Sequence, residues 1–132
     1  MQFMLDTNIY SYVLRSRPPS VKARVDEAGD GALAISTVVL AELCYGAARH
    51  PQAVAIRREI ADLVPRLAVL PWDEPAAEHY GALRATLENA GTPLGAMDMM
   101  IAAHARSAGL TLVSNDVRHF EGVEGLSVAH WV

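Results

Sequence analysis

The chain has 132 residues, and because 52% of them are hydrophobic it can bury one core but is too short for two ordinary domains. Its single cysteine excludes an internal disulfide framework, and no apolar stretch approaches the roughly 20 residues needed to cross a bilayer. The formal net charge of −4 argues against a protein that holds nucleic acid on a broad basic surface. We therefore expect one soluble, cytoplasmic domain over residues 1–132, without membrane contact, that holds any nucleic acid locally.

Short apolar runs alternate with longer helix-like segments along the chain. Strands are predicted over residues 3–5, 33–35, 68–70 and 110–113, with a weaker one near 126–128. Helices are predicted over about residues 7–14, 20–28, 37–49, 52–64, 75–90 and 96–108. Gly91 and Gly109 stand where a helix end favours a left-handed residue. Strands that alternate with helices predict an α/β fold, a three-layer α/β/α sandwich with a mostly parallel central sheet.

Four acidic residues are predicted to meet at one edge of this sheet. Asp6 directly follows the first strand, and Asp116 follows the fourth. Glu42 falls in the second turn of the helix after the second strand, and Asp98 in the first turn of the helix that leads into the fourth. A helix that feeds a parallel strand starts at the edge where the strands end. All four side chains are therefore expected at the carboxyl edge, where such sheets bind ligands.

Three of the four acids also have a purely structural explanation. Asp6 could cap the following helix, Asp98 could complement a helix dipole, and Asp116 could cap the turn that it begins. Glu42 interrupts an apolar helical run with no cation within helical reach. A shared divalent cation would account for all four, and oxygen-only ligands favour Mg²⁺ or Mn²⁺.

The chemistry that such a site supports is hydrolysis of a phosphodiester, because a divalent ion activates water and stabilises the displaced oxygen. Without metal, converging carboxylates repel one another. At least one of these acids is therefore expected to have a raised pKa in the folded chain.

Basic residues gather in a short N-terminal stretch that could contact phosphate. The candidate RNA contacts are Arg15, Arg17, Lys22 and Arg24, together with Asn115. A solvated surface face explains the basic stretch equally well, and Asn115 could be a turn residue. Cys44 is expected to be a small core residue, and His104 is expected to be a packed or surface side chain instead of a general base.

Four segments together resemble the PIN-domain ribonuclease toxins of VapBC (type II) toxin–antitoxin pairs. They are 4–8, 35–47, 91–106 and 112–120, and the resemblance covers nearly the whole chain. It implies an Mg²⁺- or Mn²⁺-dependent endoribonuclease that stops translation, with the anticodon loop of initiator tRNA as the implied target. It also implies a homodimer, a cognate antitoxin whose tail fills the active-site groove, and contact with operator DNA only through the antitoxin.

The resemblance also implies roles for individual residues. The metal-site acids are Asp6, Glu42 and Asp98, with Asp116 as the fourth. The supporting polar groups are Thr7, Asn8 and Ser114. Similar toxins often carry Asn at the fourth position, where an amide can still ligate or position water.

Two other functions stay open at this point. An Asp after the first strand is also typical of Asp-based phosphotransferases and of receiver domains. These need a lysine near the site, and the phosphotransferases need a second Asp two residues on, whereas this chain has Asn8 there and its only lysine is Lys22. A catalytically inactive PIN-like binding module is the second alternative, and the four intact acids argue against it.

Overall fold

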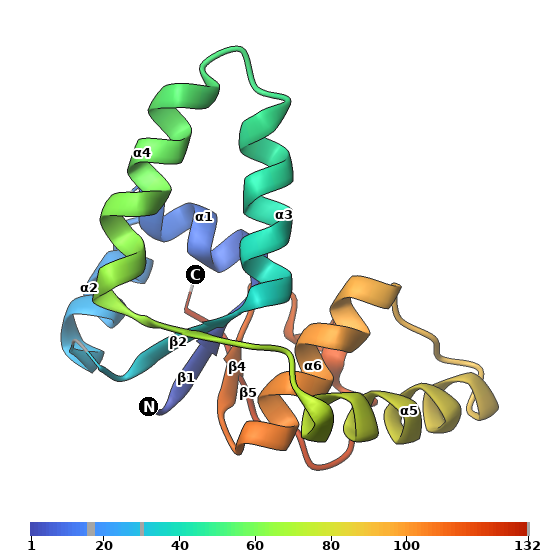
Figure 1. Cartoon of the computed structure of the whole chain (residues 1–132). Coiled ribbons are helices and arrows are strands. Elements are labelled where there is room, and N and C mark those ends of the chain that lie inside the picture. Colours follow the sequence, from blue (N-terminus) through green and yellow to red (C-terminus); the bar gives the residue numbers. More distant parts are fainter. Residues whose placement is uncertain (16–17, 30, 132) are drawn as a thin grey trace.

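The structure is a computed structural model that describes residues 1–15, 18–29 and 31–131 (Figure 1). Its strands are β1 (Phe3–Leu5), β2 (Leu33–Ser36), β3 (Ala68–Leu70), β4 (Thr111–Val113) and β5 (Val128–Ala129). Its helices are α1 (Thr7–Arg15), α2 (Pro19–Ala28), α3 (Thr37–Ala48), α4 (Ala53–Leu63), α5 (Glu74–Asn89) and α6 (Ala96–Ala108). Two short 3₁₀ turns, η1 (Val64–Arg66) and η2 (Val117–Phe120), complete the described part.

The described strands form a parallel five-stranded sheet in the order β3-β2-β1-β4-β5. The first strand is central, with Met4 aligned with Ala34 on one side and with Leu112 on the other. The α5–α6 pair covers one side of the sheet, and α1, α3 and α4 lie on the other (Figure 1). The predicted α/β/α architecture is confirmed, and the sheet is parallel throughout the described residues.

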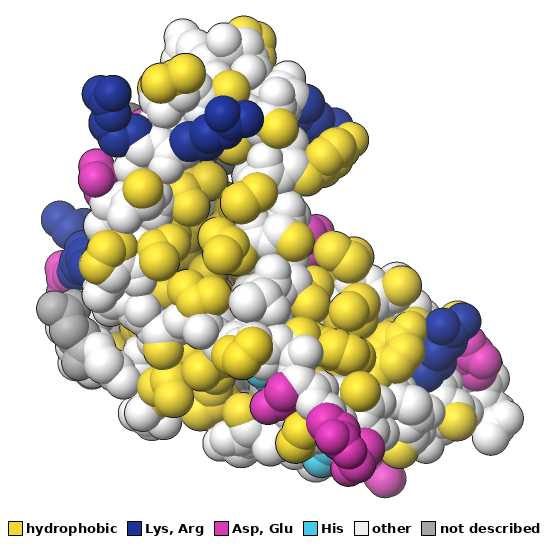
Figure 2. Space-filling model, in the orientation of Figure 1, with side chains coloured by type: hydrophobic (Ala, Val, Ile, Leu, Met, Phe, Trp, Pro, Cys, Tyr) yellow, Lys and Arg dark blue, Asp and Glu magenta, His cyan; other side chains and the backbone are white. Residues whose placement is uncertain are grey.

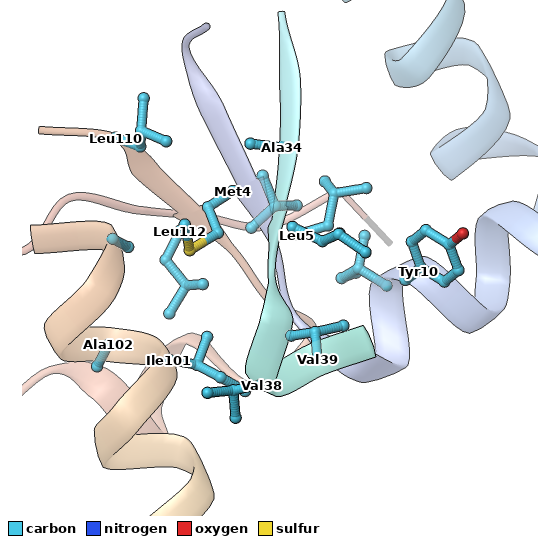
Figure 3. Close-up of a cluster of buried hydrophobic side chains, with 14 of the residues drawn as sticks. Met4, Leu5, Tyr10, Ala34, Val38, Val39, Ile101, Ala102, Leu110 and Leu112 are labelled. Atoms are coloured by element: carbon cyan, nitrogen blue, oxygen red, sulfur yellow. The ribbon is translucent and has the colours of Figure 1, made fainter. Parts of the chain in front are cut away.

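Core side chains fill both faces of the sheet because successive residues of a strand point to opposite sides. Met4 and Leu112 lie on the face toward Ile101 of α6, whereas Leu5 points toward Val39 and Tyr10 (Figure 3). All of these side chains are buried. β1 is therefore buried by helices on both faces, and Asp6 follows it at the carboxyl edge of the sheet.

The C-terminal strand lies slightly later than the sequence predicts. The prediction placed it near residues 126–128, but a turn over residues 123–126 precedes it, in which Leu126 N–H donates to the Val123 carbonyl and Gly125 has a φ of +77°. The strand therefore pairs only over Val128–Ala129. Within the described residues, every helix is too short or too polar to cross a bilayer.

The prediction that Cys44 is packed in the core is wrong. The side chain is exposed on α3, together with Ala41 and Tyr45. Helix α3 carries apolar residues on all sides, so the pattern could not show which face points inward. Of the two environments expected for His104, packed or at the surface, the structure shows the first, because this side chain is buried.

Candidate active site

The four predicted acids follow the elements expected to bring them to the carboxyl edge of the sheet. Asp6 comes directly after β1, and Asp116 comes shortly after β4. Glu42 lies in the second turn of α3, and Asp98 lies in the first turn of α6. The backbone N–H of Asp6 donates to the Val113 carbonyl at 3.1 Å and so joins the ends of β1 and β4.

Asp6 is the most enclosed of the four acids, with 8% of its surface exposed. Its Oδ1 accepts from the backbone N–H of Ile9 at 2.8 Å, so Asp6 does cap α1, as the structural explanation proposed. Burial raises the pKa of Asp6, hydrogen bonds from Ile9 and Ser114 oppose this, and the negative charges of Asp98 and Glu42 raise it further. The expectation of an acid with a raised pKa is confirmed, although burial contributes more than repulsion.

Glu42 has a partner that helical spacing does not reveal. The hydroxyl of Thr7 donates to Glu42 Oε1 at 2.8 Å, across 35 residues of sequence. This bond joins the start of α1 to the second turn of α3 and explains how a half-buried acid stands in an apolar helix. Thr7, which the resemblance implies as a supporting group, thus contacts a candidate site acid directly.

Asp98 is held by a residue that the sequence analysis did not select. His119 Nε2 lies 2.8 Å from Asp98 Oδ2, and both side chains are partly exposed. The two residues are 21 positions apart and lie on different elements, α6 and η2. In the sequence, His119 could be connected with the site only because it lies in the turn that Asp116 begins.

Asp116 is exposed and acts as the cap of η2, as its structural explanation proposed. Its Oδ1 accepts from His119 N–H at 3.3 Å, and its own N–H donates to Ser114 Oγ at 3.1 Å. Hydrogen bonding by Ser114 also lowers the pKa of Asp6, so Ser114 connects the Asp6 carboxylate with the backbone of Asp116. Asn115 turns toward α1 instead, where its amide donates to the Tyr12 hydroxyl at 3.1 Å.

The donor chemistry of this edge fits an oxygen-ligated divalent cation, because the negative charges of two further carboxylates, Asp98 and Glu42, act on the buried Asp6. As the side chains stand in the described part of the chain, no three His, Cys, Asp or Glu residues form a group that could hold one ion. Glu42 and Asp98 are each engaged by another partner, Thr7 and His119. Ligation of one ion by Asp6, Glu42 and Asp98 would therefore require Glu42 and Asp98 to leave these partners and turn toward Asp6.

A cavity of about 370 Å³ opens beside Glu42, between α1, α3 and α4. Thr7, Glu42 and Glu59 contribute to its wall, as do the apolar Ile56 and Ile60. Arg49 and His50 lie at the end of α3, where they also line it. The cavity thus continues the carboxylate edge along the helical hairpin α3–α4, which projects from the sheet (Figure 1).

Comparison with known proteins identifies the family. The model of the PIN domain matches residues 3–126. The chain is 43% identical over 131 residues to a tRNA(fMet)-specific endonuclease VapC of Shigella flexneri, covering 99% of this chain and 98% of the relative. It is 39% identical to the ribonuclease VapC2 of Haemophilus influenzae, covering 100% and 99% of the two chains. The chain belongs to the VapC group of PIN domains.

Solved structures of VapC proteins share the fold along their whole length. DNA-bound VapBC from Salmonella typhimurium matches with a TM-score of 0.94 at 36% identity, covering 100% of this chain and 99% of the other. VapBC2 from Rickettsia felis, bound to a promoter DNA fragment, matches with a TM-score of 0.93 at 30% identity and full coverage of both chains. The resemblance drawn from the four sequence segments is confirmed.

Of the predicted basic contacts, the two whose side chains the structure describes, Lys22 and Arg24, do not lie at the acids. Lys22 and Arg24 are exposed on α2, and Arg24 lines a cavity of about 280 Å³ with Gln2, Phe3 and Trp131. This cavity lies where β1 begins, at the sheet edge opposite to Asp6, which makes Arg24 a poor candidate for contact at the scissile phosphate. The Arg15 side chain and the whole of Arg17 lie outside the described residues, and Asn8 is exposed near the acids.

Proposed function

We propose that this chain is an Mg²⁺- or Mn²⁺-dependent endoribonuclease, the toxin of a toxin–antitoxin pair that acts in the cytoplasm and inhibits translation. One observation carries the proposal: Asp6, Glu42 and Asp98 come from three different parts of the chain, and the charges of the latter two act on the buried Asp6. The names of the VapC relatives, which are ribonucleases, support the choice of RNA as substrate.

Some side chains of the site would hold the metal, and others orient the side chains that hold it. When bound, a divalent ion would lower the pKa of water and stabilise the negative charge that develops on the oxygens of the phosphodiester. Asp6, Glu42 and Asp98 would hold it, and Thr7 and His119 orient two of these carboxylates through one oxygen each. Ser114 links Asp6 to the backbone of Asp116, which keeps the fourth acid at the edge of the site.

The test is cleavage of RNA by the purified protein with Mg²⁺ or Mn²⁺ and with a chelator. We expect activity to be lost in chelator and in Asp6→Asn and Glu42→Gln. The matched control is Glu88→Gln, which only breaks an exposed ion pair with Arg84 on α5. Cleavage that persists in chelator would exclude the metal mechanism, and a correctly folded wild type without cleavage would favour an inactive binding module.

Initiator tRNA is the substrate that we propose. The support is the name of the Shigella flexneri relative, a tRNA(fMet)-specific endonuclease, which matches this chain over almost its full length. Incubation with initiator and elongator methionine tRNAs, followed by mapping of the 5′ ends, tests this. Cleavage confined to the anticodon loop of the initiator is expected, and equal cutting of both tRNAs would exclude this specificity.

We also propose that the cavity between α1, α3 and α4 receives a segment of a cognate antitoxin. Structural neighbours of this chain are VapBC complexes, and the two acids in the cavity wall, Glu42 and Glu59, favour a segment with a basic side chain. Contact with operator DNA would then occur only through the antitoxin. Co-purification with the product of the adjacent reading frame should be lost in Ile56→Asp, while RNA cleavage by the variant persists.

A homodimer is the last part of the proposal. Tyr45 is 67% exposed on α3 beside the exposed Ala41 and Cys44, an apolar face turned away from the α3–α4 cavity. Hydrophobic side chains also lie over α6 on the same side of the molecule (Figure 2). Sedimentation of the wild type as a dimer, and of Ala41→Arg as a monomer, would support association through α3.

A further inference from the structure

A buried hydrogen bond joins Ser36 to His104, which lie 68 residues apart in the sequence. Ser36 Oγ and His104 Nδ1 are 2.8 Å apart, and the two residues are 0% and 2% exposed. Ser36 ends β2 and caps α3, because its Oγ accepts from Val38 N–H at 3.1 Å. Among the described residues the Ser36 hydroxyl hydrogen has His104 Nδ1 as its acceptor and no other, so we assign the hydroxyl as the donor and Nδ1 as the acceptor.

The chemistry of His104 suits this acceptor role. Burial lowers the pKa of His104, and the negative charge of Asp73 only partly opposes this. The ring is therefore neutral at neutral pH, with its hydrogen on Nε2 and its lone pair on Nδ1. The bond to Ser36 is thus an interaction between two uncharged buried groups, each of which would lose a partner if the other were removed.

A second bonded path joins the same two helices. Trp72 N–H donates to Thr37 Oγ1 at 3.1 Å, and Trp72 Nε1 donates to the Met100 carbonyl at 3.0 Å. Thr37 is the first residue of α3, and Met100 lies one turn before His104 on α6. Two independent links therefore connect the start of α3 to the middle of α6.

These links join the helices that carry two of the site acids. Ser36 precedes Glu42 by six residues, and Asp98 precedes His104 by six, so about 9 Å of rigid helix separates each linking residue from an acid. A small shift of α3 against α6 would change the separation of the two carboxylates.

We propose that Ser36 and His104 are positioning residues, whose buried hydrogen bond sets the separation of Glu42 and Asp98 and so tunes the affinity of the site for its divalent ion. The inference rests on the proposed function. Neither residue is assigned a part in the chemistry, and both act through the helices that they join.

The test compares substitutions that keep or remove the acceptor at His104. His104→Asn places an amide oxygen near the position of Nδ1, whereas His104→Leu is of similar size and leaves the Ser36 hydroxyl without an acceptor. His104→Gln places its polar end near Nε2 instead and serves as a second variant without the link. The control is Leu87→Ala, which removes buried side-chain volume from α5 and leaves the two side chains of the hydrogen bond unchanged.

Calorimetric titration with Mn²⁺ gives the readout, supported by kcat and KM for RNA cleavage and by melting temperature. In His104→Leu and His104→Gln we expect the Mn²⁺ dissociation constant to rise about tenfold, at the lower end of the effects seen for groups that orient ligands. His104→Asn should recover most of the affinity. Leu87→Ala should have a lower melting temperature and an unchanged Mn²⁺ affinity.

In the Ser36→Ala/His104→Leu double variant, the loss of Mn²⁺ affinity should not exceed that of the single variant with the larger loss.

Each outcome bears on a separate conclusion. If the wild type binds Mn²⁺ and the folded His104→Leu or His104→Gln protein binds it equally well, the positioning role is wrong while the proposed function stands. The role is also wrong if His104→Asn is no better than His104→Gln, or if Leu87→Ala weakens Mn²⁺ binding as much. A wild type that binds no Mn²⁺ would overturn the proposed function, and this inference with it.

Discussion

Among single residues, Asp6 experiences the largest conflict between its charge and its surroundings. Its carboxylate caps α1 and is buried beside two other acids. Burial and like charge favour its protonated form, whereas the bonds from Ile9 and Ser114 favour the ionised form. The folded chain without metal therefore holds Asp6 in an unfavourable state at neutral pH.

The pH dependence of stability should show this conflict. The pKa of Asp6 is raised in the folded chain, so as pH rises Asp6 loses its proton earlier in the unfolded state than in the folded state. The free energy of unfolding in chelator should therefore fall as pH rises from about 4 through the pKa of Asp6 in the folded chain. Asp6→Asn can keep the bond from Ile9 and should lack this decline. Urea unfolding of both proteins from about pH 4 to pH 7 measures it. Parallel stability profiles would contradict a raised pKa.

Asp116 should tolerate an amide better than the other acids do. It is exposed, and the oxygen that accepts from His119 N–H can be supplied by Asn. We expect Asp116→Asn to keep the fold and to lose activity only on the order of tenfold, against complete loss in Asp6→Asn. Initial rates of RNA cleavage at saturating Mn²⁺ provide the comparison. Equal losses in the two variants would show that the fourth charge is essential.

The sequence placed the acids, and the resemblance named Thr7 as a supporting group, but neither showed which acid Thr7 contacts or that His119 contacts Asp98. Asp6 and Glu42 could be located because a strand end and a helix turn set their positions along the chain. The partners of Glu42 and Asp98, Thr7 and His119, depend on how α1 and η2 pack against α3 and α6. Side-chain rotamers decide such contacts, and residue spacing carries no information about them.

At the scale of elements, the chain order of helices and strands followed from periodicity, and errors arose where periodicity fails. Helix α3 is apolar on every side, so its outward face, with Cys44, could not be predicted. The two residues of β5 are too few to show an alternating pattern, and Gly125 delays their start. Helix ends were predicted well where a glycine marks them, as at Gly109.

Two glycines of the α5–α6 pair should respond in opposite directions to alanine. Gly109 ends α6 with a φ of +69°, so Gly109→Ala should cost about 1 kcal/mol of stability. Gly81 lies exposed within α5, where an added Cβ meets no atom within 4 Å, so Gly81→Ala should stabilise by about 0.5–1 kcal/mol. Thermal unfolding measures both changes. A stabilised Gly109→Ala would contradict the left-handed helix end.

For the whole molecule, the main expectation is that metal binding and folding are coupled. Mn²⁺ at a hundredfold its Kd should stabilise the wild type by about 2.7 kcal/mol. Asp98→Asn should gain much less, because it lacks one of the carboxylates that we propose as ligands. Melting curves of both proteins with chelator and with Mn²⁺ are the measurement. If Mn²⁺ raised the melting temperature of both proteins equally, the ion would bind at a site that does not include Asp98.

The central position of β1 has a consequence for how the protein is made. Among the five strands β1 is synthesised first, yet one of its two neighbours, β4, begins only at Thr111. Asp98 lies in α6, the helix directly before β4. On the ribosome, Asp6 and Glu42 emerge long before the segments that bring Asp98 and Ser114 beside Asp6. Because a parallel sheet forms only when such distant strands meet, a partly translated chain has no assembled site. A site with this topology is therefore assembled only after the segment through β4 has been synthesised.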